Sequence, residues 1–131
     1  MKLPDAYVID SFAWIEYFLG TAAGHKAKGF IESDKGITPT IVIAELTEKY
    51  RRERLPIATD LDFIIAKTRI APLDTKIAER AGSLSPDRKQ KVKRWGLADS
   101  IVLATSREYG AKVVTGDEHF RDLADETEMI S

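Results

Sequence analysis

The sequence contains no cysteine, no asparagine and a single glutamine, Gln90. The absence of cysteine excludes a disulfide framework, a thiolate metal site and a cysteine nucleophile. Two histidines are too few for a histidine-rich zinc site. A bound metal would therefore be held mainly by oxygen, which favours Mg²⁺ or Mn²⁺. The shortage of thermolabile amides beside 31% charged residues is also typical of proteins from thermophiles.

The chain also has no long apolar run and no strong net charge. Its longest uninterrupted apolar stretches, such as residues 41–44 and 63–66, are far too short to span a bilayer. The N-terminus does not resemble a signal peptide, so we expect a soluble, cytoplasmic protein without membrane contact. A net charge of −1 gives no global basic field, so any contact with RNA must depend on local patches. The length of 131 residues fits one domain, and 44% hydrophobic residues predict a folded core.

Short β-rich runs alternate with segments of helical periodicity along the chain. Strands are predicted at residues 7–9, 36–38, 69–72, 112–115 and 128–130. Helices are predicted at residues 12–19, 22–33, 40–52, 57–67, 75–81 and 98–109, and residues 83–94 are predicted to form a loop with at most one short helix. This alternation predicts an α/β fold with a mainly parallel central sheet flanked by helices. Ligands of such sheets bind beyond the carboxyl ends of the strands.

Four acidic residues stand out against this pattern. Asp10 directly follows the first predicted strand, and Asp117 follows the fourth by one residue. Parallel strands end on one side of a sheet, so both carboxylates should meet at the same edge. Asp99 opens the helix that leads into the fourth strand, where the helix N-terminus also favours an anion. Glu45 interrupts an apolar helical stretch, which predicts a largely buried carboxylate with a partner distant in sequence.

Each acid also has a purely local explanation. Asp10 and Asp99 could cap helices, and Asp117 could be an ordinary turn residue. Glu45 could face solvent beside Lys49. The combination favours a shared site, in which several carboxylates would repel one another unless a divalent cation were bound. Such a site supports metal-assisted hydrolysis of a phosphodiester.

Four segments of the chain resemble the motifs of the PIN domain. They are residues 7–16 (YVIDSFAWIE), 38–46 (TPTIVIAEL), 96–104 (GLADSIVLA) and 113–120 (VVTGDEHF). The resemblance covers almost the whole chain in the right order, and within that family the chain is similar to the VapC toxins of prokaryotic toxin–antitoxin pairs. It implies a single PIN domain over residues 1–131, folded as a three-layer sandwich. It further implies a homodimeric, Mg²⁺- or Mn²⁺-dependent endoribonuclease that a small antitoxin inhibits.

The same resemblance assigns roles to individual residues. It places metal-binding and catalytic acids at Asp10, Glu45, Asp99 and Asp117. Thr115 would support the site by hydrogen bonding, and Ser11 occupies the small-hydroxyl position beside the first acid. The predicted reaction is attack of a metal-activated water on an RNA phosphate, which leaves 5′-phosphate and 3′-hydroxyl ends.

Basic residues gather on both sides of the predicted acidic crevice. The candidate RNA-binding group is Arg88, Lys89, Lys91, Lys93 and Arg94, and a second basic group follows Glu45 at residues 49–54. Both groups could contact RNA phosphates, although a solvated charged face is the simpler explanation for any one residue. Trp95 is expected in the core, and His119 is expected to be structural or solvent-exposed.

The sequence is also compatible with three other functions. A PIN-like nuclease could act in RNA processing, or on DNA, without an antitoxin. A phospho-acceptor domain could use Asp10 as the acceptor, but Phe12 stands where a phosphatase of that kind would carry a second acid. A non-catalytic interaction module would use the acids only as caps and turns.

Overall fold

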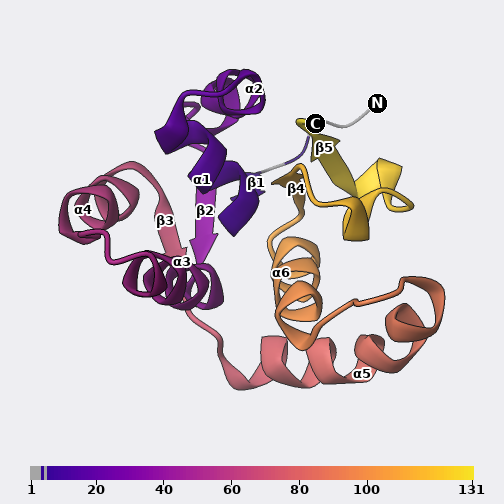
Figure 1. Ribbon diagram of the computed structural model, residues 1–131. Helices are drawn as coiled ribbons and strands as arrows, with labels where there is room; N and C mark the ends of the chain where they lie inside the picture. Colours follow the sequence, from indigo (N-terminus) through magenta and orange to yellow (C-terminus); the bar gives the residue numbers. More distant parts are fainter. Residues whose placement is uncertain (1–3, 5) are drawn as a thin grey trace.

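A five-stranded, wholly parallel sheet forms the centre of the computed structural model, which describes residue 4 and residues 6–131 (Figure 1). The strands are β1 (Ala6–Ile9), β2 (Gly36–Pro39), β3 (Arg69–Ala71), β4 (Ala111–Thr115) and β5 (Thr127–Met129). They lie in the order β3-β2-β1-β4-β5, so β1 is the central strand. Val8 of β1 pairs with Ile37 of β2 on one side and Val113 of β4 on the other.

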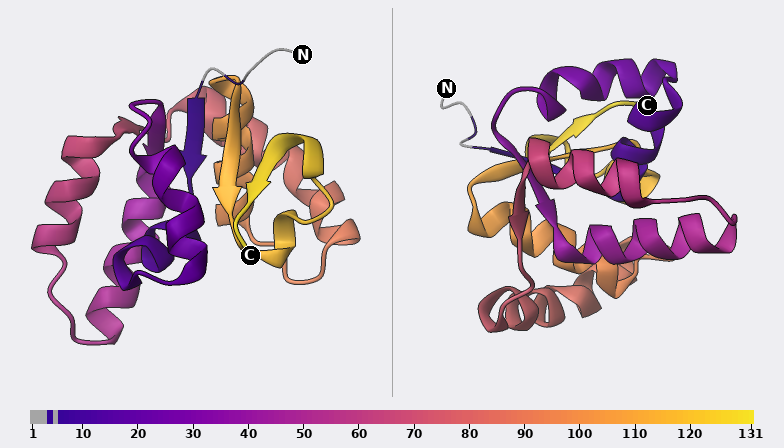
Figure 2. Two further views of the ribbon diagram at one scale, coloured as in Figure 1. Left: turned by 90° about the horizontal axis from the view of Figure 1, so that it is seen from above. Right: turned by 90° about the vertical axis from the view of Figure 1, so that its left-hand side faces the viewer.

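Helices cover both faces of this sheet. They are α1 (Ser11–Leu19), α2 (Ala22–Ile31), α3 (Thr40–Arg52), α4 (Ala58–Lys67), α5 (Thr75–Lys91) and α6 (Leu97–Glu108). Helices α1 and α2 lie on one side of β1 and β4, and α6 lies on the other with α5 packed against its outer side (Figures 1 and 2). The predicted α/β sandwich with a mainly parallel sheet is therefore confirmed.

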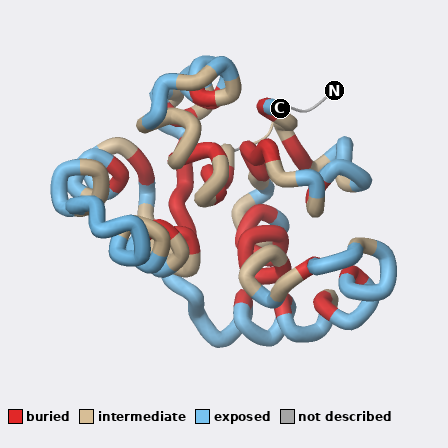
Figure 3. The backbone as a smooth tube through the Cα atoms, in the orientation of Figure 1, coloured by how far each residue is buried: buried red, intermediate tan, exposed pale blue. Residues whose placement is uncertain are grey.

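Strands β1 and β4 are buried on both faces of the sheet. Val8, Ile9, Val113 and Val114 have no exposed surface, and the red strands at the centre of Figure 3 show the same arrangement. Parallel strands covered by helices on both sides read as continuous apolar runs, which explains the sequences of β1 and β4. Trp14 of α1 is equally buried. No helix among residues 6–131 is long and apolar enough to cross a membrane.

Local signals set most of the element boundaries. Helix α1 ends at Gly20, whose φ of 70° lies in the left-handed region that glycine adopts without strain. Asp10 caps the start of the same helix. Helix α3 spans the residues that its pattern predicts.

The prediction that residues 83–94 form a loop with at most one short helix is wrong for most of this stretch. Helix α5 continues to Lys91, with Pro86 inside it. Its buried residues are Ile77, Ala81, Ser85 and Arg88, which recur at helical spacing. Burial of this face helps the helix to continue past a proline that would usually end it.

Candidate active site

The carboxyl ends of β1 and β4 bring two of the predicted acids to one edge of the sheet. Ile9 pairs with Val114 in the register of the two strands. The next backbone N–H, that of Asp10, still donates to the Val114 carbonyl at 3.3 Å. Asp117 follows β4 after a single glycine. The expected meeting of these two acids therefore occurs, and the negative charge of Asp117 contributes to raising the pKa of Asp10.

Asp10 is the most deeply buried of the four acids, with 6% of its surface exposed. Burial is the main reason that its pKa rises from 3.8 to about 7, and the charges of Asp117 and Glu45 act in the same direction. Two hydrogen bonds oppose the rise, one from the Thr115 side chain and one from the backbone N–H of Ala13 at 2.9 Å. The site therefore holds a carboxyl group whose negative charge is poorly compensated.

Glu45 reaches the same site from α3. Its pKa is raised, first by burial and then by the charge of Asp99, while a hydrogen bond from Ser11 opposes the rise. The side chain is half-buried, not largely buried as predicted, because neighbouring residues of α3 face solvent. Lys49 does not neutralise it, because that ammonium group pairs with Glu53 at 2.6 Å.

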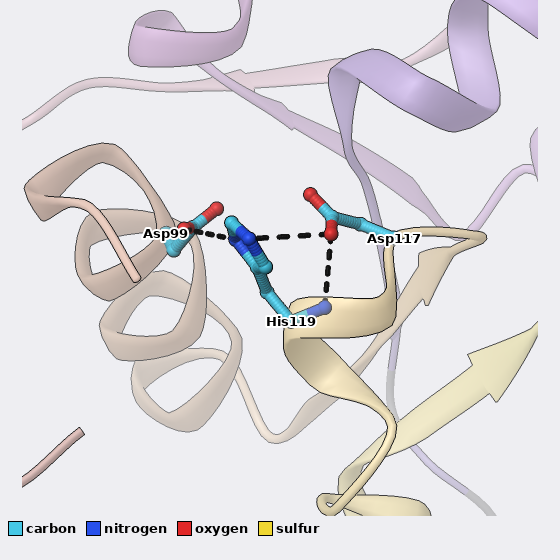
Figure 4. A group of neighbouring side chains, drawn as sticks. All are labelled: Asp99, Asp117 and His119. Carbon is cyan, nitrogen blue, oxygen red and sulfur yellow. Dashed lines mark hydrogen bonds and ion pairs between the residues drawn. The ribbon is translucent and has the colours of Figure 1, made fainter. Parts of the chain in front are cut away.

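Asp99 and Asp117 lie on either side of the His119 imidazole ring (Figure 4). The Nδ1 atom of His119 is 2.9 Å from Oδ2 of Asp99 and 3.7 Å from Oδ1 of Asp117. One ligand atom from each of the three residues lies within 4.8 Å of the others, so together they could hold a metal ion. The sequence pattern does not single out His119, and its only signal is a position two residues after Asp117.

The local roles of these acids are also real. Asp10 caps α1, Asp99 accepts the Gly96 N–H at the start of α6 at 2.9 Å, and Asp117 accepts the His119 N–H at 2.9 Å. Each of these bonds uses one carboxylate oxygen and fixes the plane of the group. The caps therefore orient the carboxylates, and the same two oxygens, Oδ2 of Asp99 and Oδ1 of Asp117, face the imidazole of His119.

Thr115 and Gly116 shape the turn that carries Asp117. The buried Thr115 hydroxyl oxygen accepts the Asp117 backbone N–H at 2.9 Å and also forms a hydrogen bond with Asp10. It thus ties the two strand ends together. At Gly116 any Cβ atom would overlap the ring of Phe12. Only glycine fits this close approach.

An open groove of about 680 Å³ reaches the site at Asp117. Asp117 and His119 line it together with the basic residues Lys93 and Arg94. Lys89 and Lys91 are exposed on α5 but do not line this groove. Of the predicted RNA-binding residues, Lys93 and Arg94 therefore share a groove with Asp117.

Arg88 requires a correction, because its guanidinium group is buried and already paired. It donates to both carboxylate oxygens of Asp122 at 2.7 and 2.9 Å and to the His119 carbonyl at 3.1 Å. It also lies 4.2 Å from the centre of the Trp95 ring. Arg88 therefore does not face RNA and instead holds the 3₁₀ turn Glu118–Phe120 against α5. Trp95 is in the core, as expected.

The chain is therefore an α/β protein with a parallel sheet and a group of acids beyond the ends of β1 and β4. Such an oxygen-rich site is of the kind that suits divalent cations. The sequence profile of the PIN domain matches residues 7–126, and the chain belongs to this family. No curated protein sequence matches the chain closely enough to count as a relative.

Solved structures with the same fold include a toxin–antitoxin complex from Klebsiella pneumoniae. It is 20% identical with a TM-score of 0.72, over 96% of this chain and 98% of that chain. Another is VapC20 from Mycobacterium tuberculosis, which is described as a toxin that cleaves the sarcin–ricin loop. It is 16% identical to this chain with a TM-score of 0.70, and the match covers 90% of this chain and 95% of VapC20. FitAcB from Neisseria gonorrhoeae is 20% identical with a TM-score of 0.67, and the match covers 94% of this chain and 96% of that chain.

Proposed function

We propose that this protein is a Mg²⁺- or Mn²⁺-dependent endoribonuclease and the toxin of a toxin–antitoxin pair, acting from a single PIN domain. The observation that carries this proposal is the convergence of four carboxylates at one sheet edge, where the pKa of Asp10 rises to about 7. Membership of the PIN family supports nuclease chemistry. An RNA substrate is supported by the likeness to a toxin that cleaves the sarcin–ricin loop.

The donor set of the site fits a hard divalent cation. Carboxylate oxygens are the ligands that Mg²⁺ and Mn²⁺ prefer. The charges of Asp99 and Asp117 help to raise the pKa of Glu45, so the carboxylates repel one another as they stand. A cation held by Asp10, Glu45, Asp99 and Asp117 would remove this repulsion. When bound, it would polarise the phosphate and lower the pKa of a coordinated water.

The protein's own residues would orient the substrate and the acids. Lys93 and Arg94 line the same groove as Asp117, where their positive charges would hold RNA phosphates. Thr115 fixes Asp10 relative to Asp117, and Ser11 fixes Glu45. We expect cleavage to leave 5′-phosphate and 3′-hydroxyl ends.

The decisive experiment is cleavage of RNA with Mg²⁺, Mn²⁺ or EDTA, comparing the wild type with Asp10→Asn and Asp99→Asn. Asp74→Asn is the matched control, because Asp74 also caps a helix by accepting a backbone N–H at 2.9 Å but is exposed on α5. We expect metal-dependent cleavage by the wild type and the control, and loss of cleavage in both site variants. Cleavage that persists in EDTA and yields 2′,3′-cyclic phosphates would contradict the proposed mechanism.

A small antitoxin is the partner that we propose, acting on a homodimer in the cytoplasm. The structural likeness to a toxin–antitoxin complex supports such a partner. A groove of about 460 Å³ between α1, α3 and α4 supports it further, because exposed Leu19 and Leu55 line the groove beside Phe18, with charged residues such as Glu16 and Lys49 around them. An amphipathic segment of an antitoxin would bury these side chains.

Co-expression with the product of the neighbouring reading frame tests this partner. We expect a stable complex that does not cleave RNA, and we expect Leu55→Glu to break the complex without abolishing cleavage. Ile65→Glu is the control, because Ile65 is as exposed as Leu55, at 53%, and does not line the groove. A neighbouring product that neither binds nor inhibits would favour a nuclease of RNA processing that has no antitoxin.

A further inference from the structure

We propose that His119 is itself a ligand of the cation at this site, and that its nitrogen makes the site prefer Mn²⁺ to Mg²⁺. The inference rests on the metal-dependent function proposed above, and it adds one residue and one selectivity to it. The carboxylates alone would suit either ion. An imidazole nitrogen is a softer ligand that suits transition metals better than Mg²⁺.

The spacing of the donor atoms fits octahedral coordination. Ligands about 2.1 Å from a central ion lie about 3.0 Å apart along an octahedron edge. The Nδ1 atom of His119 is 2.9 Å from Oδ2 of Asp99 and 3.7 Å from Oδ1 of Asp117. The first separation matches such an edge, and the second exceeds it by about 0.7 Å.

The position of His119 is fixed by contacts on every part of the residue. Its backbone N–H donates to Asp117, and its carbonyl accepts the buried Arg88 guanidinium at 3.1 Å. Its ring lies beside Trp95, with the two ring centres 6.4 Å apart. The imidazole is therefore held between the two carboxylates, so ligation would cost little conformational entropy.

A hydrogen bond from Nδ1–H to Asp99 explains the same 2.9 Å separation, and the two explanations make different predictions. As a hydrogen-bond donor, His119 would orient Asp99 and would affect the affinities for Mg²⁺ and Mn²⁺ by the same factor. As a ligand, it would contribute a nitrogen that chiefly benefits Mn²⁺. The ratio of the two affinities therefore separates the explanations.

Pulsed electron paramagnetic resonance of the Mn²⁺-loaded protein detects a coordinated nitrogen directly. We expect ¹⁴N modulation from an imidazole in the wild type, and its replacement by ¹⁵N modulation after labelling of histidine. The signal should disappear in His119→Gln, whose side chain offers an oxygen, and persist in His25→Ala. His25 is the matched control because it is the other histidine of the chain, exposed on α2.

Calorimetric titration with each ion completes the test. We expect His119→Gln and His119→Ala to lower the affinity for Mn²⁺ by about 10- to 100-fold and the affinity for Mg²⁺ by a clearly smaller factor. Mn²⁺ binding without nitrogen modulation, or an unchanged ratio of affinities, would overturn the assignment of His119 and leave the proposed function intact. Failure of the wild type to bind Mn²⁺ at all would overturn both.

Discussion

Replacing Asp10 by asparagine should stabilise the metal-free protein at alkaline pH. Asp10 is buried, and burial raises its pKa from 3.8 to about 7. Below pH about 4 the group is protonated in both the folded and the unfolded chain, so it contributes no difference. Between pH about 4 and 7 the unfolded chain loses the proton while the folded chain keeps it, so stability falls as the pH rises. Above pH about 7 the full loss is present.

The size of this loss follows from the shift in pKa. A rise from 3.8 to about 7 is roughly three pKa units, which corresponds to about 4 kcal/mol in the free energy of unfolding. Asparagine caps a helix as well as aspartate does, so Asp10→Asn should keep the bond from the Ala13 N–H. The variant therefore removes the ionisation without removing the cap.

Urea denaturation in EDTA at several pH values measures the difference. We expect Asp10→Asn to exceed the wild type in stability by about 4 kcal/mol near pH 8 and to match it near pH 4. The exposed cap variant Asp74→Asn should stay within about 0.5 kcal/mol of the wild type throughout. Added Mn²⁺ should stabilise the wild type more than Asp10→Asn. Equal stabilities of Asp10→Asn and the wild type near pH 8 would refute the argument from burial.

Three further perturbations test the groove, the buried ion pair and the turn. In a filter-binding assay, Arg94→Glu should weaken RNA binding and reduce the slope of log affinity against log salt concentration by about 0.7 per lost phosphate contact. The control Lys35→Glu should change neither quantity, because Lys35 is exposed just before β2, at the opposite end of the sheet. Arg88→Lys should lower the free energy of unfolding by about 1–3 kcal/mol, because an ammonium group cannot form the bidentate hydrogen bonds that Arg88 makes with Asp122. A variant as stable as the wild type in urea denaturation would contradict this prediction. Gly116→Ala should lower the free energy of unfolding by about 1–3 kcal/mol, because the added methyl group would overlap Phe12. Gly82→Ala should raise it by about 0.5–1 kcal/mol, because this helical glycine has open space around it. Changes in the same direction for both variants would contradict the packing argument.

The sheet and the gathering of the acids follow from the sequence pattern alone. Val8 and Ile9 of β1, and Val113 and Val114 of β4, are apolar neighbours because both faces of the sheet are buried there, and that pattern is visible without a structure. Asp10 and Asp117 follow the ends of these strands, and parallel strands end on one side. Their approach is thus a consequence of local pattern and one general rule of topology.

Only the tertiary structure decided what surrounds those acids. Arg88 and Asp122 are 34 residues apart, and no local signal predicts that they pair and that the arginine is buried. The place of His119 between Asp99 and Asp117 likewise depends on how the 3₁₀ turn packs against α5 and α6. Such contacts join segments that are distant in the chain, so the energies of these contacts depend on three-dimensional packing. Strand ends, helix caps and hydrophobic periodicity depend instead on neighbours in the sequence.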